Sequence, residues 1–362
     1  MVRRSMAGLP GTLSLLQSCF MPVCNVPCTR AIAVHRTPAK GPVFRIMSRP
    51  AQPALVASPD NPCPEGAVVG NVETADGALL RVARWDATAS PRGTVCVFTG
   101  RSEYIEKYFE TVEALRERGF AVAAMDWRGQ GHSSRQLGDP RKGHVWSFAE
   151  FEHDVEAFMR DVVQPHCPQP YYALAHSMGA TVMLRIAHSG RRWFDRLILV
   201  APMIDLPHGR TSWPLRALMR GLRLAGLGSR YVPGSNVDAV RAKGFDGNPL
   251  TSDEARFVRN AAIVGAQPSL GIGSPSVAWL DAAFSAMMAF RSADYPSRIV
   301  QPVLMVAAGA DTIVSPVACA AFAARLPAGS HLVVEGARHE LLQERDDHRA
   351  KFWAAFDAFM GR

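Results

Sequence analysis

The chain has 362 residues, of which 48% are hydrophobic, and a formal net charge of +8. This length allows one large α/β domain with an insertion, or two small domains. Residues 1–50 hold seven Lys or Arg and no Asp or Glu, so subtracting these seven charges leaves +1 for residues 51–362. A nearly neutral remainder lacks the charge excess typical of nucleic-acid-binding proteins, and we expect no nucleic-acid partner.

The N-terminal residues differ in composition from the rest of the chain. Residues 1–65 are rich in Pro, Arg and Ser, which predicts a disordered N-terminal extension. Arg3 and Arg4 precede a weakly apolar stretch, 13–23, so a poor secretory signal is an alternative. A further alternative is that the natural start is Met47.

The cysteines indicate neither disulfides nor a metal site. Their number is odd, no paired spacing suggests a disulfide framework, and Cys24 and Cys28 lack the further Cys or His of a zinc site. We therefore expect a reduced, cytoplasmic setting. The chain has no run of about 18 apolar residues, so we expect no transmembrane helix.

Strand-like and helix-like patterns alternate from residue 66 to 205 and again from 297 to 362. The expected strands are 67–73, 78–85, 94–98, 121–125, 171–175, 197–200, 303–307 and 331–334. The expected helices are 106–118, 148–162, 180–188, 317–325 and 347–359. This alternation predicts a mostly parallel central sheet flanked by helices, which is the α/β class.

The alternation is interrupted between residues 206 and 296. This segment is helix-like and irregular, with Pro, Gly and Met throughout. An excursion between two strands of one sheet predicts an inserted helical lid (cap), with an ordinary second domain as the alternative. The core would then comprise 66–205 and 297–362.

Three side chains predict nucleophilic catalysis. Ser177 lies between an expected strand and an expected helix, and Asp311 and His339 each follow a later strand. A serine hydroxyl needs a base within hydrogen-bond reach, and that base needs a third group to hold its tautomer. The carboxyl ends of parallel strands share one edge of a sheet, so we expect a catalytic triad of Ser177, His339 and Asp311.

The turn around Ser177 requires small neighbours. Gly179 satisfies this two residues later, whereas Ala175 stands two residues earlier, where glycine is usual. The tetrahedral intermediate needs N–H donors for its oxyanion. We expect them to be the backbone N–H groups of Met178 and Arg101, with Gly100 allowing close approach.

A glycine-rich loop, 126–133, follows another expected strand. Its spacing fits neither a dinucleotide-binding nor a P-loop motif, so we interpret it as a loop, beginning at Asp126, that supports the active-site floor. His176 is expected to be a packing or polar neighbour rather than a catalytic base.

Several stretches together resemble one family. The chain resembles the α/β-hydrolases of the lysophospholipase and monoacylglycerol lipase group, over about 73–361. The monoacylglycerol lipase pattern has His-Gly where Thr99-Gly100 stands here, so the chain is more similar to the bacterial lysophospholipase branch. The resemblance implies Ser177 as nucleophile with Asp311 and His339, a helical lid, and no metal or organic cofactor. The stretches that carry it are 99–103, 126–133, 176–179, 202–205, 248–253 and 339–342.

The expected activity is hydrolysis of a small lipid ester, a lysophospholipid or a monoacylglycerol, through an acyl-enzyme. An aminopeptidase or a carbon–carbon bond hydrolase could use the same triad. A hydrolase-shaped binding protein without turnover is the alternative from another class.

The expected lid begins with a basic segment. Residues 206–237 hold five arginines and no acidic residue, and Arg216, Arg220 and Arg223 share one helical face beside several leucines. Such a segment can contact an anionic membrane or hold a lipid phosphate. A solvated helix face is the alternative.

Overall fold

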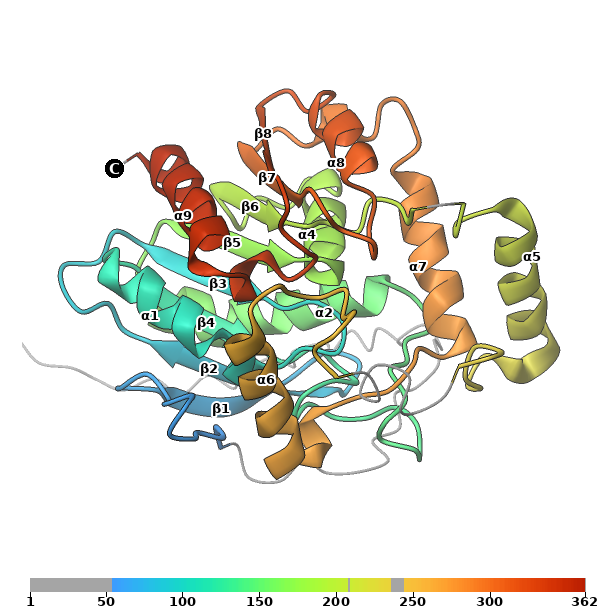
Figure 1. The fold of residues 1–362 in the computed structure, drawn as a ribbon, viewed down its shortest axis with the longest axis horizontal. Coiled ribbons are helices and arrows are strands. Elements are labelled where there is room, and N and C mark those ends of the chain that lie inside the picture. The colour runs from blue at the N-terminus through green and yellow to red at the C-terminus, as the bar shows by residue number, and fades with distance from the viewer. Residues whose placement is uncertain (1–53, 208, 236–243, 362) are drawn as a thin grey trace, which may run out of the picture. The chain divides into compact units, whose positions relative to one another are not determined.

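An eight-stranded sheet forms the centre of the protein (Figure 1). The computed structural model describes residues 54–207, 209–235 and 244–361. The strand order is β1-β2-β4-β3-β5-β6-β7-β8, in which β2 is antiparallel to β1 and β4 and all other pairs are parallel. The strands are β1 (Val68–Glu73), β2 (Leu79–Trp85), β3 (Thr94–Phe98), β4 (Ala121–Met125), β5 (Tyr171–His176), β6 (Arg196–Val200), β7 (Val303–Ala308) and β8 (Gly329–Val334).

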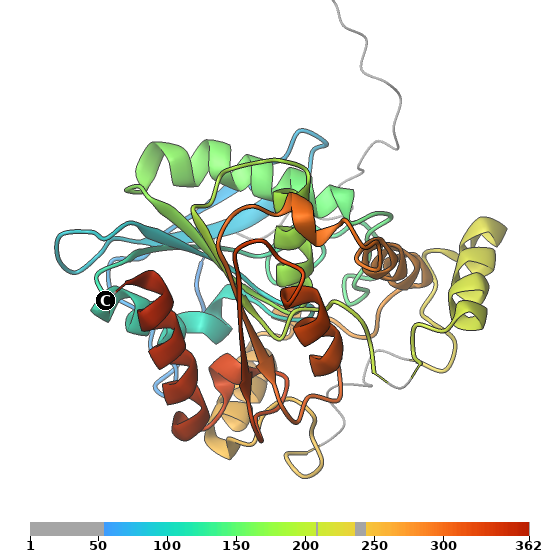
Figure 2. The same cartoon turned by 90° about the horizontal axis from the view of Figure 1, so that it is seen from above.

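Helices cover both faces of this sheet (Figure 2). α1 and α9 pack on one face, and α2, α4 and α8 on the other. The α-helices are α1 (Phe109–Glu117), α2 (Ala149–Phe158), α3 (Gln164–His166), α4 (Met178–His188), α5 (Trp213–Leu222), α6 (Glu254–Ala266), α7 (Val277–Ala289), α8 (Pro316–Ala323) and α9 (Asp346–Met360). Short 3-10 or π segments are η1 (Ile105–Tyr108), η2 (Met159–Val163), η3 (Arg223–Leu227), η4 (Pro268–Leu270), η5 (Pro296–Arg298) and η6 (Leu341–Gln343). The predicted α/β class is confirmed.

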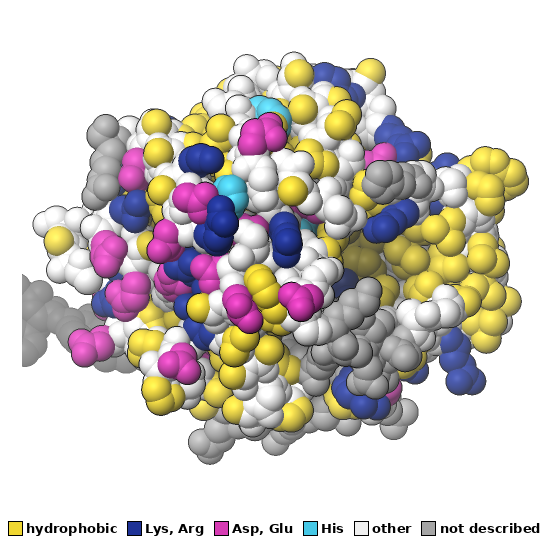
Figure 3. Space-filling view, in the orientation of Figure 1, with side chains coloured by type: hydrophobic (Ala, Val, Ile, Leu, Met, Phe, Trp, Pro, Cys, Tyr) yellow, Lys and Arg dark blue, Asp and Glu magenta, His cyan; other side chains and the backbone are white. Residues whose placement is uncertain are grey.

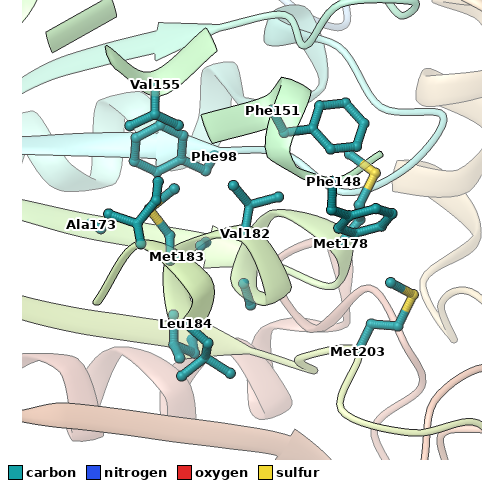
Figure 4. Packing of buried hydrophobic residues seen from close by; sticks show 14 of the residues in the cluster. Phe98, Phe148, Phe151, Val155, Ala173, Met178, Val182, Met183, Leu184 and Met203 are labelled. Atoms are coloured by element: carbon teal, nitrogen blue, oxygen red, sulfur yellow. The ribbon is translucent and has the colours of Figure 1, made fainter. Parts of the chain in front are cut away.

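The two cores follow from the alternation of side chains along a strand. In β3, Cys96 and Phe98 face the core under α2 and α4, whereas Val95 and Val97 face the core under α1 and α9. Figure 4 shows Phe98 pointing toward Val155 of α2. All of these side chains are buried, as expected of parallel strands covered on both faces.

The parallel register makes the carboxyl ends of the central strands level. Phe98 at the end of β3 pairs with Met125 of β4 and with Ala175 of β5. His176 pairs with Val200 at the end of β6. The loops that follow these strands therefore begin at one edge of the sheet.

Between β6 and β7 the chain leaves the sheet and forms α5, α6 and α7. α7 is largely buried against the core, whereas Met219 is the one buried residue of α5. Side-chain caps start two of the helices: Asp253 accepts the N–H of Arg256 at α6, and Ser276 accepts the N–H of Trp279 at α7.

Residues 54–65 contact the sheet, although composition predicted disorder for all of 1–65. Asn61 donates to the carbonyl oxygen of Glu106 at 3.0 Å, and the Trp85 indole donates to that of Pro64 at 3.1 Å. The disorder prediction is therefore wrong for 54–65, because this stretch gains specific hydrogen bonds that composition does not reveal. Residues 1–53 lie outside the described part.

A buried arginine joins β2 to η1 and to the loop after β4. Arg81 donates from Nε to Asp126 at 2.7 Å and from both Nη atoms to Glu106 at 2.6 and 2.7 Å. All three side chains are fully buried. Removing one partner of such a cluster leaves an uncompensated buried charge. The resulting loss of stability exceeds the net stability that the intact cluster contributes.

We expect Arg81→Met to lower the free energy of unfolding by about 3–5 kcal/mol, because Asp126 and Glu106 lose their counter-ion. Urea denaturation at neutral pH measures this loss. Arg84→Met, on the same strand, is the matched control, since its partner Asp86 is exposed and such pairs contribute about 1 kcal/mol or less. Equal losses in the two variants would contradict the assignment.

A second cluster connects α6 to the core. Glu110 of α1 accepts from Arg256 at 2.6 and 2.9 Å, from Arg259 at 3.0 Å, and from Arg349 of α9. Burial alone would raise the pKa of Glu110, but the hydrogen bond from Arg256 and the charges of Arg349, Arg256 and Arg259 hold that pKa at about 2.

This depressed pKa makes stability depend on pH. The contribution of Glu110 is complete above the pKa of the unfolded carboxyl, about 4.3, and is lost as pH falls toward 2. We expect Glu110→Gln to lower the unfolding free energy by about 1–2 kcal/mol at pH 7, after allowance for partial exposure, and by less at each step down from pH 5. Glu113→Gln on the same helix is the control, and a loss independent of pH would contradict the expectation.

Candidate active site

Ser177 occupies a tight turn between β5 and α4. Its φ of 51° and ψ of −113° are sparsely populated for a residue with a side chain. The turn is held by its backbone: the Ser177 N–H donates to the Val200 carbonyl oxygen at 3.0 Å, and its own carbonyl accepts from Met203 at 3.2 Å. The serine is thereby presented at the carboxyl edge of the sheet.

Gly179 allows α4 to approach β3 closely. A Cβ atom at this position would lie 2.6 Å from the carbonyl oxygens of both Phe98 and Thr99, distances that real Cβ atoms essentially never show. Ala175, by contrast, keeps its extra methyl group fully buried in β5. The turn therefore needs glycine after the serine and accommodates alanine before it.

The three residues expected to form a triad lie within hydrogen-bond distance of one another. His339 Nε2 is 3.0 Å from Ser177 Oγ, and His339 Nδ1 is 2.7 Å from Asp311 Oδ2. The other carboxylate oxygen of Asp311 accepts the N–H groups of Ile313 at 2.7 Å and Val314 at 3.0 Å, which fixes its orientation. All three residues are buried.

The two expected oxyanion donors line the same cavity as Ser177. Met178 is the first residue of α4, so its N–H has no partner within the helix. The N–H of Arg101 donates to no acceptor in the described part of the chain. Gly100 lets the loop pass closely, because a Cβ there would lie 2.8 Å from Glu103 Oε2.

A buried ionic cluster that the sequence did not reveal lies behind the triad. His176 contacts Glu103 through Nδ1 at 3.0 Å and the carbonyl oxygen of His339 through Nε2 at 3.1 Å. Lys107 donates to Glu103 at 2.9 Å and also to Glu340. The sequence signal that could have found it is the set of three charged side chains at positions 103, 107 and 340, next to the proposed oxyanion loop and to His339.

The charges of this cluster support one another. Burial would raise the pKa of Glu103, but His176 and Lys107 hold it well below its usual value. Burial would lower the pKa of His176, but Glu103 raises it. A protonated His176 donates from both ring nitrogens, which its two acceptors require. The cluster therefore holds the backbone of His339 in place.

Asp126 supports the loop that carries Arg101. Its Oδ1 accepts the N–H of Ile105 at 3.0 Å. From the same glycine-rich loop, Gln130 donates to the carbonyl oxygen of Gly100 and accepts the N–H of Ser102, both at 3.0 Å. The glycine-rich loop thus supports the loop of Arg101, and Gln130 adds a contact that the sequence did not single out.

The segment before α6 is tied to the loop of His339. The N–H of Glu340 donates to the Leu250 carbonyl oxygen at 2.8 Å. Arg338 donates to the carbonyl oxygens of Asn248 at 3.0 Å and Thr251 at 2.9 Å. These bonds hold both sides of His339 against the insertion.

A cavity of about 850 Å³ opens above Ser177. Its polar wall lies near the loop of Arg101 and the buried ionic cluster. The rest of the wall is mainly apolar and comes from the insertion and the loops after β6 and β7: Met203, Leu206, Leu250, Phe257, Val264, Ile272, Trp279, Leu280, Met287, Ile313 and Val314.

Two of the three basic residues of the expected lid form ion pairs within the protein. Arg220 lies 3.1 Å and Arg223 2.7 Å from the carboxylate of Asp281 on α7, whereas Arg216 has no ion pair with a described residue. The sequence could not reveal this pairing, because Asp281 lies far along the chain. Only part of the basic charge is therefore left for an external anion.

The described residues offer neither a metal site nor a membrane-spanning helix. No cluster of three or more His, Cys, Asp or Glu in that part of the chain could hold a metal ion. No described helix has the length and apolar character needed to cross a bilayer.

Known proteins resemble this chain in sequence. The model of the family described as serine aminopeptidase, S33, matches residues 89–346. Lysophospholipase L2 of Escherichia coli is 30% identical over 299 residues, which are 79% of this chain and 85% of the relative. Monoglyceride lipase of Mus musculus is 25% identical over 130 residues, 36% of this chain and 41% of the relative.

Solved structures share the fold. A soluble variant of monoglyceride lipase from Saccharomyces cerevisiae superposes with a TM-score of 0.64 and 22% identity, over 81% of this chain and 96% of that one. A carboxyl esterase from Bacillus coagulans gives 0.66 and 20%, over 82% and 98%. The chain therefore belongs to the serine aminopeptidase S33 family of α/β-hydrolases and is one of its lysophospholipase- and monoacylglycerol lipase-like members.

Proposed function

We propose that this protein is a serine hydrolase that cleaves carboxylic esters of lipid type, namely lysophospholipids or monoacylglycerols. The observation that carries the proposal is the hydrogen-bonded series Ser177, His339 and Asp311 at the floor of a largely apolar cavity. The names of the relatives, lysophospholipase and monoglyceride lipase, support the choice of substrate.

The proposed reaction uses each group once in each half of the cycle. His339 Nε2 accepts the proton of Ser177 as the hydroxyl attacks the ester carbonyl, and the N–H groups of Met178 and Arg101 stabilise the oxyanion. His339 then protonates the leaving alcohol, and water repeats the sequence on the acyl-enzyme. Asp311 holds the Nδ1–H tautomer and stabilises the imidazolium that forms.

An aminopeptidase activity is less well supported by the cavity. A substrate with a free α-ammonium group needs a carboxylate to receive it. The acidic residues among the described lining are Glu103 and Glu340, and both already pair with Lys107. A panel of lysophospholipids, monoacylglycerols, aminoacyl amides and carbon–carbon bond substrates would rank the alternatives.

We further propose that residues 206–296 act as a lid over the cavity and that its α5 side contacts anionic membranes. Trp213, Leu218 and Leu224 are 71%, 51% and 80% exposed. Figure 3 shows hydrophobic side chains gathered over α5. Together with Arg216, such a surface suits the boundary between head groups and acyl chains.

For the triad, we expect Ser177→Ala to lose labelling by a fluorophosphonate probe and to lose at least about a thousandfold in kcat on monooleoylglycerol. His339→Gln should behave alike, and Asp311→Asn should lose at least about a hundredfold because the tautomer is no longer held. Gel labelling and release of fatty acid measure both effects.

Ser102→Ala is the matched control, since Ser102 lines the same cavity without contacting His339. It should still be labelled. Unlabelled wild type, or equal labelling of Ser177→Ala, would favour a binding protein without turnover.

For the membrane contact, we expect the double variant Trp213→Ala, Leu224→Ala to bind vesicles at least about tenfold more weakly, because two apolar anchors are lost. Replacing Arg216, Arg220 and Arg223 by Gln should weaken binding to vesicles containing phosphatidylserine and leave neutral vesicles unaffected. Sedimentation with liposomes gives the bound fraction. Arg141→Gln, an exposed arginine elsewhere, is the control, and unchanged binding in both sets would remove the membrane proposal.

A further inference from the structure

Arg101 brings an unbalanced cation to the wall of the cavity. Its two Nη atoms donate to Ser102 Oγ at 3.0 Å and to the carbonyl oxygen of Gly273 at 2.5 Å, and the guanidinium lies 5.2 Å from the ring centre of Trp279. Its Nε has no partner, and no carboxylate within the described ranges pairs with it. Three of the five N–H bonds of the group are therefore unused.

The other charges around the cavity are already compensated. Glu103 and Glu340 pair with Lys107, and Glu103 also pairs with His176. Burial lowers the pKa of Arg101 to about 10, so the group remains cationic at neutral pH. A desolvated cation without a counter-ion is destabilising, and an anionic ligand would offset that cost.

The position of the Arg101 guanidinium matches that of the phosphate group in a lysophospholipid. The backbone N–H of Arg101 is a proposed oxyanion donor, and its guanidinium carbon lies roughly six covalent bonds of about 1.5 Å further along the side chain. In a lysophospholipid, the phosphorus also lies about six such bonds from the ester carbonyl carbon, on the alcohol side. The larger part of the wall is apolar and suits the acyl chain.

We propose that the Arg101 guanidinium binds the phosphate group of the substrate and so makes the enzyme prefer lysophospholipids to neutral monoacylglycerols. The proposal rests on the lipid-ester hydrolase function above. Planar guanidinium groups bind phosphate oxygens through paired hydrogen bonds, and the unused N–H bonds of Arg101 supply the donors. The bond to Gly273 at the same time orients the side chain toward the insertion.

The test compares two esters with the same acyl chain, 1-oleoyl-lysophosphatidylglycerol and 1-oleoylglycerol. We expect Arg101→Gln to lower the ratio of their kcat/KM values, phosphate ester over neutral ester, by about tenfold or more, mainly through KM. Arg101→Lys should retain part of the preference, because it keeps a point charge without the paired geometry. Thermal unfolding of each variant checks that the fold is kept.

Arg135→Gln is the matched control. Arg135 is also buried and is held by the carbonyl oxygens of Gly131 at 2.7 Å and Ser269 at 2.9 Å, but it does not line the cavity. Its loss should leave the ratio unchanged. If Arg101→Gln slows the hydrolysis of both esters equally, the ratio is unchanged in this variant too. Arg101 then only ties the insertion to the core, and the proposal is overturned.

A binding measurement separates this proposal from the proposed function. If the wild type hydrolyses neither ester, the lipid-ester function fails, and calorimetric titration with glycerol 3-phosphate then decides the site. Binding that is lost in Arg101→Gln supports a phosphate site, and equal binding overturns it. Inorganic phosphate that binds as tightly as glycerol 3-phosphate would overturn the assignment to a lipid head group.

Discussion

The contact between the first turn of α4 and the end of β3 is the constraint on which the site depends. Because position 179 has no side chain, the helix approaches the carbonyl oxygens of Phe98 and Thr99. This approach brings the N-terminus of α4, with Ser177 and Met178, to the loop of Arg101. The proposed nucleophile and both proposed oxyanion donors are thus positioned by backbone, which is more rigid than side chains and is preorganised for charge that develops in a transition state.

The histidine is positioned by charge rather than by backbone packing alone. His176 is the last residue of β5, and its ring contacts the carbonyl oxygen of His339 while Glu103 raises its pKa. One buried ionic cluster therefore connects the end of β5 to the loops after β3 and β8. Asp311 acts from the opposite side through its own hydrogen bonds to Ile313 and Val314, so that the imidazole is held at both ends.

The strands, the order of Ser177, Asp311 and His339, and the α/β class could be predicted from the sequence, because apolar periodicity and strand ends are local signals. The ionic cluster was not predicted, because Lys107 and Glu340 are 233 positions apart and nothing local in the sequence indicates that their side chains meet. The pairing of Arg220 and Arg223 with Asp281 escaped prediction for the same reason. Residues 54–65 were misjudged because a few specific hydrogen bonds outweighed an unpromising composition.

The hydrogen bonds between the segment before α6 and the loop of His339 make α6 more firmly attached to the core than α5 is. Leu250 and its neighbours are hydrogen-bonded on either side of His339, and Glu110 ties α6 to α1 and α9. A movement of α6 would therefore displace the His339 imidazole from Ser177. Among the described residues, α5 packs chiefly on α7 and makes no hydrogen bond to the loop of His339, so α5 can shift while the hydrogen bonds among Ser177, His339 and Asp311 stay intact.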